Sequence, residues 1–317
     1  MSFAAPKDRT AIKVGTFEIG NETNRASLVK AGKTDSQRSW ENSAEAVAAA
    51  IVDSDCDVMG VQDLGDVIGG RGEEGPSLKS VLDKVAGEGV YKLFIPGNKN
   101  ANYPLDGHLG RAAGVLWKAG RFECLDWGIS WLSGLYDKPG KSSELKFGDG
   151  SMAMAWVKLR EKTTGKVFVF ASAGTNGPSQ NDHGKPIKYP EINTANCTNI
   201  VKILREDIVP DGTPSIFVLN SHNATSSDGY KALNSSRWFD VWDRLNDESL
   251  LSEDAAKQIN TMNSEDEKRL QGGRPDHIFI DGFQIESYAV LRKKFPTADG
   301  SLHYPAFHFP VVAELAF

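Results

Sequence analysis

Two histidines of this 317-residue chain stand in polar surroundings at the ends of apolar segments. His222 belongs to the run Asn220-Ser221-His222-Asn223, and His308 directly precedes the last apolar segment. An imidazole has a pKa near 6.5 and can exchange a proton at neutral pH. We therefore expect His222, His308 and Asn223 to be candidate catalytic residues, with Asn220 as a ligand-binding neighbour. The alternative is a hydrogen-bonded cluster that has no chemical role.

Two carboxylates form a second candidate site. Glu18 and Asp63 each stand at the end of an apolar segment with the pattern of a strand. If these strand ends are neighbours, the pair could hold a divalent cation, with Asn223 or His308 contributing a ligand. Hard cations such as Ca²⁺ take roughly six to eight oxygen ligands. The alternative is therefore a polar rim whose carboxylates are satisfied by water or by Arg111.

Hydrophobic periodicity predicts strands and helices that alternate along the chain. Strands are expected over 12–19, 57–62, 112–117, 122–131, 153–161, 166–173, 215–220, 277–280, 285–291 and 309–317. Helices are expected over 40–53, 76–86 and 193–208, and the polar segment 235–273 is expected to be a helical or loop excursion. This order predicts an α/β fold, a four-layer α/β/β/α sandwich of two packed mixed sheets with outer helices. We expect residues 1–11 to be an N-terminal extension and residues 12–317 to be one domain.

The composition of the chain limits the kinds of molecule that we expect it to bind. Hydrophobic residues make up 40% of the chain, enough for a substantial core. The net charge of −6 argues against nucleic acid as a partner, because binding phosphates requires clustered Lys and Arg. No apolar run approaches the roughly 20 residues of a membrane-spanning helix. With no signal peptide in the first ten residues, we expect a cytoplasmic protein, or a secreted one if a signal has been removed.

Four segments carry a resemblance to known motifs. DVMGVQD (57–63) is similar to "DVIGLQE", RPDHIF (274–279) to "RIDYIF", and AFHFPVVA (306–313) to "SDHFPVVA". SIFVLNSHNA (215–224) stands where "IVTGDFNA" is expected. These motifs are those of the DNase-I-like endonuclease/exonuclease/phosphatase family, and the chain resembles that family in order from residue 12 to residue 317. The resemblance implies the DNase-I-like four-layer fold.

The same resemblance implies phosphoester hydrolysis with a divalent ion, usually Mg²⁺. In such a site carboxylates hold the ion, an Asp–His pair activates water, and a His with Asn neighbours stabilises the developing charge. Asn223, Asp276 and His308 match the family pattern. The replaced positions are Glu18 for Asn, Asp63 for Glu, Arg111 for Glu, Ala171 for Asn, Ala173 for His, Ser221 for Asp and Phe307 for Asp.

These replacements argue against the usual reaction. General acid–base catalysis alone contributes roughly 10²- to 10⁴-fold to a rate, and Ser221 cannot orient or activate water as an aspartate does. Because Phe307 replaces the adjacent aspartate, we expect His308 to lack an orienting carboxylate. The sequence therefore predicts a degenerate family member that has lost Mg-dependent phosphoester hydrolysis and uses the inherited pocket to bind a ligand or partner.

The expected ligand-binding residues are Glu18, Asn220, Arg111 and Asp276. The expected cofactor is none, or a weakly bound Mg²⁺ or Ca²⁺ at Asp63 and Glu18. The expected partner is a small molecule or a protein.

Two other classes of function stay open. The first is an enzyme with a non-canonical site: either a divergent metal-dependent phosphodiesterase or nuclease, or a metal-independent acid/base catalyst that uses His222 and His308. The second is a purely structural interaction protein, in which Phe307 would fill the metal position.

Overall fold

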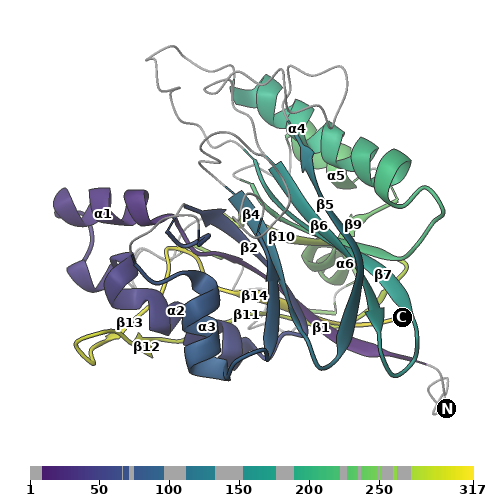
Figure 1. Ribbon diagram of the computed structural model, residues 1–317. Helices are drawn as coiled ribbons and strands as arrows, with labels where there is room; N and C mark the ends of the chain where they lie inside the picture. The colour runs from purple at the N-terminus through teal and green to yellow at the C-terminus, as the bar shows by residue number, and fades with distance from the viewer. Residues whose placement is uncertain are drawn as a thin grey trace.

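The structure is a computed structural model that describes residues 9–65, 67–70, 75–95, 112–132, 153–175, 189–221, 227–234, 237–248, 250–251, 260–262 and 273–317. Two mixed sheets face each other in the middle of the molecule. Helices α1, α2 and α3 lie outside one sheet and helices α4 and α5 lie outside the other (Figure 1), while α6 contributes Val241 and Leu245 to the core between the sheets. The predicted four-layer α/β/β/α sandwich is confirmed.

The first sheet has its described strands in the order β11-β14-β1-β2-β4-β3. Central strand β1 pairs antiparallel with β14 and parallel with β2. The strands are β1 (Ala11–Glu18), β2 (Val58–Leu64), β3 (Tyr91–Phe94), β4 (Ala112–Lys118), β11 (Gln284–Val290) and β14 (Val311–Ala316). The helices on its outer side are α1 (Glu22–Lys30), the 3₁₀ turn Ser36–Arg38, α2 (Trp40–Ser54) and α3 (Leu78–Ala86).

The second sheet has the described order β5-β6-β7-β8-β10-β9. Its strands are β5 (Phe122–Trp131), β6 (Ala153–Glu161), β7 (Val167–Gly174), β8 (Ser215–Asn220), β9 (Phe239–Asp240) and β10 (Asp276–Asp281). Its helices are α4 (Tyr189–Ile203), continued by a π-helical turn over Leu204–Ile208, α5 (Asp228–Asn234) and α6 (Val241–Asp247). A separate hairpin joins β12 (Phe295–Pro296) to β13 (Leu302–His303).

The ten predicted strands are present, and helix α2 spans the expected segment. The short strands β3, β9, β12 and β13 and helix α5 were not predicted. Helix α1 was not predicted, because it is polar and Arg25 is its one residue classed as buried. Its N-cap could have indicated it: the Asn21 side chain accepts a hydrogen bond from the backbone N–H of Asn24, and Glu22 follows in the first turn. No helix in the described part of the chain has both the length and the apolar character of a membrane span. The division at residue 11 stays a prediction.

Buried charges hold α6 against the second sheet. Arg274 contacts Asp240 and Asp243, each at 2.7 Å, and His277 Nδ1 lies 2.7 Å from the second oxygen of Asp240. The guanidinium also packs 4.5 Å from the ring centroid of Trp242. A buried charge is tolerated when it is paired and hydrogen-bonded, so this cluster fixes how α6 meets β10.

Gly60 of β2 lies directly against Val218 of β8 in the opposite sheet. A Cβ atom at Gly60 would lie 2.2 Å from Val218 Cγ2 and 2.8 Å from Ser172 Oγ. No side chain can be added there unless the opposite sheet moves. Glycine at this position therefore allows the two sheets to lie close together.

We expect Gly60→Ala to lower the free energy of unfolding by about 1–3 kcal/mol or more, because overpacking forces a well-packed core to shift. Urea unfolding followed by circular dichroism measures the loss. Gly120→Ala is the matched control, because a Cβ at Gly120 meets nothing within 4 Å. Equal stability of the two variants would contradict this account of the sheet interface.

Candidate functional site

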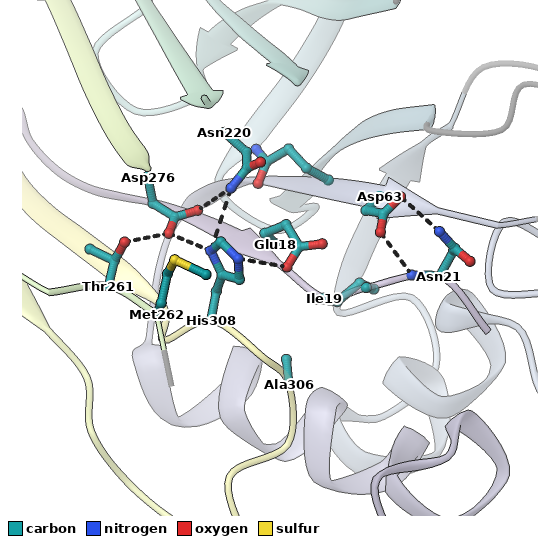
Figure 2. A network of polar contacts seen from close by, with 12 residues as sticks. Glu18, Ile19, Asn21, Asp63, Asn220, Thr261, Met262, Asp276, Ala306 and His308 are labelled. Carbon is teal, nitrogen blue, oxygen red and sulfur yellow. Dashed lines mark hydrogen bonds and ion pairs between the residues drawn. The ribbon is translucent and has the colours of Figure 1, made fainter. Parts of the chain in front are cut away.

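Polar residues gather where strands of both sheets end. Glu18 ends β1, Asn220 ends β8 and Asp276 begins β10, while His308 lies just before β14. Asn220 and Asp276 are register partners in the antiparallel β8–β10 pair. Figure 2 shows the four side chains converging across the gap between the sheets. The sequence nominated each of these four residues for the site, and the structure brings them together.

His308 is held between two carboxyl groups. Its Nδ1 lies 2.7 Å from Asp276 Oδ2, and its Nε2 lies 3.3 Å from Glu18 Oε2. The expectation that His308 lacks an orienting carboxylate is therefore wrong. The carboxylate comes from Asp276 on the neighbouring sheet rather than from the adjacent position, where Phe307 stands, and sequence adjacency could not reveal this.

Asp276 is completely buried and fully hydrogen-bonded. Asn220 Nδ2 donates to its Oδ1 at 3.0 Å, and Thr261 Oγ1 donates to its Oδ2 at 2.5 Å. Thr261 is fixed in turn by its carbonyl, which accepts from the N–H of Phe309 at 2.7 Å. Thr261 was missed from the sequence because it lies in a polar segment with no periodic pattern. The expected contact of Asp276 with a ligand stays a prediction, since Asp276 is 0% exposed.

The buried groups have shifted pKa values. Burial raises the pKa of Glu18 to about 8; His308 opposes this rise, and Asp63 and Asp276 add to it. Burial alone would lower the pKa of His308, but Asp276 and Glu18 raise it to about 9. Burial alone would raise the pKa of Asp276, but His308, Thr261 and Asn220 hold it below its ordinary value. At neutral pH, Asp276 is thus a carboxylate, His308 a cation and Glu18 a neutral acid.

Asp63 lies beside these polar groups, toward α1. Asp63 follows Gln62, which is the register partner of Glu18 in the β1–β2 pair. The backbone of Asp63 has a positive φ of 57°, at the point where the β2–β4 register shifts. Both of its oxygens accept hydrogen bonds from Asn21, one from the backbone N–H at 3.2 Å and one from Nδ2 at 2.9 Å. Asp63 lies close enough to Glu18 for its charge to raise the pKa of Glu18. Asp276, His308 and Glu18 thus form one chain of contacts, and Asp63 with Asn21 forms a separate pair beside it (Figure 2).

The replaced family positions have neutral partners. Ser221 is buried, and its Oγ accepts a hydrogen bond from Thr175 Oγ1 at 2.8 Å. Thr175 Oγ1 in turn accepts from Asn193 Nδ2 at 2.9 Å. Ala173 lies one residue before the end of β7 and is buried against apolar neighbours. Where the resemblance implies an acid and a base, the structure has hydroxyls, an amide and a methyl group.

Phe307 packs on two arginines. The Arg38 guanidinium carbon lies 4.2 Å from the centroid of its ring, and that of Arg25 lies 5.7 Å from it. Neither arginine was expected from the sequence, which gives no periodic signal for burial of Arg25 or Arg38.

The described donor atoms do not fit a divalent cation. The part of the chain described contains no group of three or more His, Cys, Asp or Glu residues placed to hold a metal ion. Both oxygens of Asp63 are engaged by Asn21, and one oxygen of Glu18 contacts His308. Hard cations require several free oxygen ligands. His222, Asn223 and Arg111, which the sequence also nominated, lie outside the described residues.

The pKa shifts predict how stability depends on pH. Both Glu18 and His308 have raised pKa values in the folded state. Their stabilisation is fully present below their ordinary values of 4.5 and 6.5, and it is lost as pH rises through about 8 and about 9. We therefore expect the urea midpoint to fall from about pH 6.5 to about pH 9, and to fall less in Glu18→Gln, where one of the two groups no longer titrates.

His303→Gln serves as the control, because this half-buried histidine of the β12–β13 hairpin bonds to Ser301 and lies outside the chain of contacts. Its pH dependence should match that of the wild type. A profile that is identical in wild type and Glu18→Gln would contradict the assignment.

A comparison with protein-family models finds no match, and a comparison with curated proteins finds none. Among solved structures, an endonuclease/exonuclease/phosphatase family protein from Bacteroides thetaiotaomicron is similar over 98% of this chain and 96% of its own, with a TM-score of 0.70 and 18% identity. The B. thetaiotaomicron VPI-5482 mannosyl-6-phosphatase is similar over 96% of this chain and 100% of its own (TM-score 0.69, 17% identity). D. rerio TDP2 complexed with single-strand DNA product is similar over 96% of this chain and 99% of its own (TM-score 0.60, 12% identity). The chain thus has the DNase-I-like fold of the endonuclease/exonuclease/phosphatase family, in a divergent sequence.

Proposed function

We propose that this protein binds a small polar ligand at the Glu18–His308 site and has lost metal-dependent phosphoester hydrolysis. One observation supports this above the others: His308 is bonded on both ring nitrogens by carboxyl groups of the protein itself. An imidazole that serves phosphoryl chemistry needs a ring nitrogen free to meet the substrate. Ser221, Ala173 and Phe307 provide no replacement for the missing acid, base and metal ligands.

The polar groups favour an uncharged, hydroxyl-bearing ligand such as a sugar. Carboxyl and amide groups from Glu18, Asp63, Asn21 and Asn220 can both donate and accept hydrogen bonds. The positive charges of His308 and Arg25 are already offset by Asp276 and Asp63, which leaves little free positive charge for a phosphate ester in a chain of net charge −6. The mannosyl-6-phosphatase among the similar structures acts on a sugar phosphate, so a sugar-sized ligand is compatible with this fold. The expectation that nucleic acid is not a partner stays a prediction, because D. rerio TDP2 is complexed with DNA.

A metal-independent acid/base enzyme is the second candidate. The contact chain from Asp276 through His308 to Glu18 favours it, because Glu18 would be a protonated acid at neutral pH, next to a cation that can restore its proton. In that reaction His308 would act through Glu18 rather than directly. His222 would remain a candidate partner.

We expect the wild type to hydrolyse bis-p-nitrophenyl phosphate and plasmid DNA no faster than buffer in the presence of Mg²⁺ or Mn²⁺. The reason is that the described residues include no group of free carboxylate oxygens that could hold a metal ion beside an acid–base pair. Release of p-nitrophenol and gel assays measure this, with His308→Ala as the comparison. Metal-dependent turnover that disappears in His308→Ala would overturn the proposal, whereas turnover that survives in His308→Ala would mark contamination.

Ligand binding has its own test. A panel of neutral monosaccharides and their 6-phosphates is screened by saturation-transfer NMR, and hits are measured by calorimetry. We expect neutral sugars to bind more tightly than their phosphates, and Glu18→Ala to weaken binding by about tenfold, the loss of one good hydrogen bond. Glu123→Ala is the control, because Glu123 is exposed and pairs with Arg160 at 3.1 Å. Preferential binding of the phosphates would contradict the proposed ligand class, and a panel without hits would favour a protein partner.

A further inference from the structure

Two arginines are buried beneath the candidate site. Arg25 of α1 is 0% exposed and Arg38 of the following 3₁₀ turn is 1% exposed. Removing a guanidinium from water costs several kcal/mol unless its donors are satisfied. Such residues are retained in a core only where their charge or their geometry is needed.

Arg25 ties together the two segments that carry Glu18 and His308. Its Nε donates at 3.0 Å to the carbonyls of Ile19 and Gly20, the two residues that follow Glu18. Its Nη1 and Nη2 both donate at 3.1 Å to the carbonyl of Pro305, three residues before His308. The planar guanidinium fixes both backbones at once, and so it fixes the distance between Glu18 and His308.

Further bonds hold Arg25 and Arg38 to each other and to α2. Arg25 Nη1 donates to the carbonyl of Arg38 at 2.9 Å and to Ser43 Oγ at 2.8 Å. Arg38 Nη2 donates to the carbonyl of Ala306, and its guanidinium lies 4.2 Å from the centroid of the Phe307 ring. Both arginines thus contact the segment that positions His308, and Phe307 provides an aromatic face for both charges.

The charge of Arg25 also acts on the carboxyl groups of the site. Burial, together with repulsion from Arg38, lowers the pKa of Arg25 to about 10, while Glu18, Asp63 and Glu22 act in the opposite direction. The guanidinium is therefore still charged at neutral pH and interacts electrostatically with both carboxyl groups that the sequence suggested as metal ligands.

We propose that the buried Arg25, supported by Arg38, takes the place of a divalent cation: Arg25 supplies a fixed positive charge beside Asp63 and the Glu18 carboxyl group, and the two arginines hold together the segments that carry Glu18 and His308. This inference rests on the proposed metal-free function and explains how the site remains assembled. A divalent ion entering beside two immobile guanidiniums would be repelled, because unit charges interact strongly at short range in a buried setting. Phe307 belongs to the same arrangement, since its ring packs on the guanidiniums where the family pattern has a carboxylate.

The test measures Mn²⁺ binding by calorimetry and the titration of His308 by NMR in the intact chain. The wild type should show no Mn²⁺ binding at millimolar concentrations. Arg25→Met should bind Mn²⁺ at least about tenfold more tightly, because a repelling charge is removed, and should shift the His308 titration to a different pH. Arg237→Met is the matched control: Arg237 is a partly buried arginine that pairs with Asp281 at the opposite end of β10, and its loss should change neither measurement.

Phe307→Asp tests the proposal without removing a buried arginine. A carboxylate introduced there would lie against both guanidiniums, so this variant should still fail to bind Mn²⁺ although a family-like acid has been restored. Mn²⁺ binding by Phe307→Asp would overturn the proposal, as would a folded Arg25→Met variant that behaves like the wild type in both measurements. Neither result would contradict the proposed ligand-binding function. That function is contradicted by a different result, in which the wild type binds Mn²⁺ and hydrolyses phosphodiesters.

Discussion

The contact between Asp276 and His308 is the interaction on which the site depends. A carboxylate that is 0% exposed is costly unless an opposite charge and hydrogen-bond donors surround it. Asp276 obtains these from His308, Asn220 and Thr261, which come from a loop, a strand end and a distant segment. These segments must therefore stay together for the charge to remain buried, and the β8–β10 register provides the frame that holds them.

The second requirement is the spacing of the sheets. Glu18 belongs to the first sheet and Asp276 to the second, so the imidazole of His308 can touch both only if the sheets approach closely. Gly60 permits that approach opposite Val218. Gly60, which has no side chain, thus determines whether the polar contacts can extend from one sheet to the other.

The sequence predicted the architecture because alternating strands and apolar helices leave a periodic signal. It also nominated Glu18, Asn220, Asp276 and His308 for the site, since the motif resemblance places them at strand ends, but it did not predict that all four meet. It did not predict which carboxylate orients His308, because Asp276 and His308 are brought together by sheet pairing rather than by sequence spacing. Arg25 and Arg38 were missed for another reason: a charged residue in a polar helix normally faces solvent, and only the carbonyl groups of distant loops explain their burial.

Asn21 has a double role at the edge of the site. Its side-chain oxygen caps α1, while its amide and backbone N–H groups bind Asp63. A molecule that draws Asp63 away from Asn21 therefore also changes the stability of the first turn of the helix that carries Arg25. By reciprocity, the local opening of α1 and the affinity of the site are thermodynamically linked. Protection of the α1 amides from hydrogen exchange thus reports on occupancy of a site that none of those amides touches.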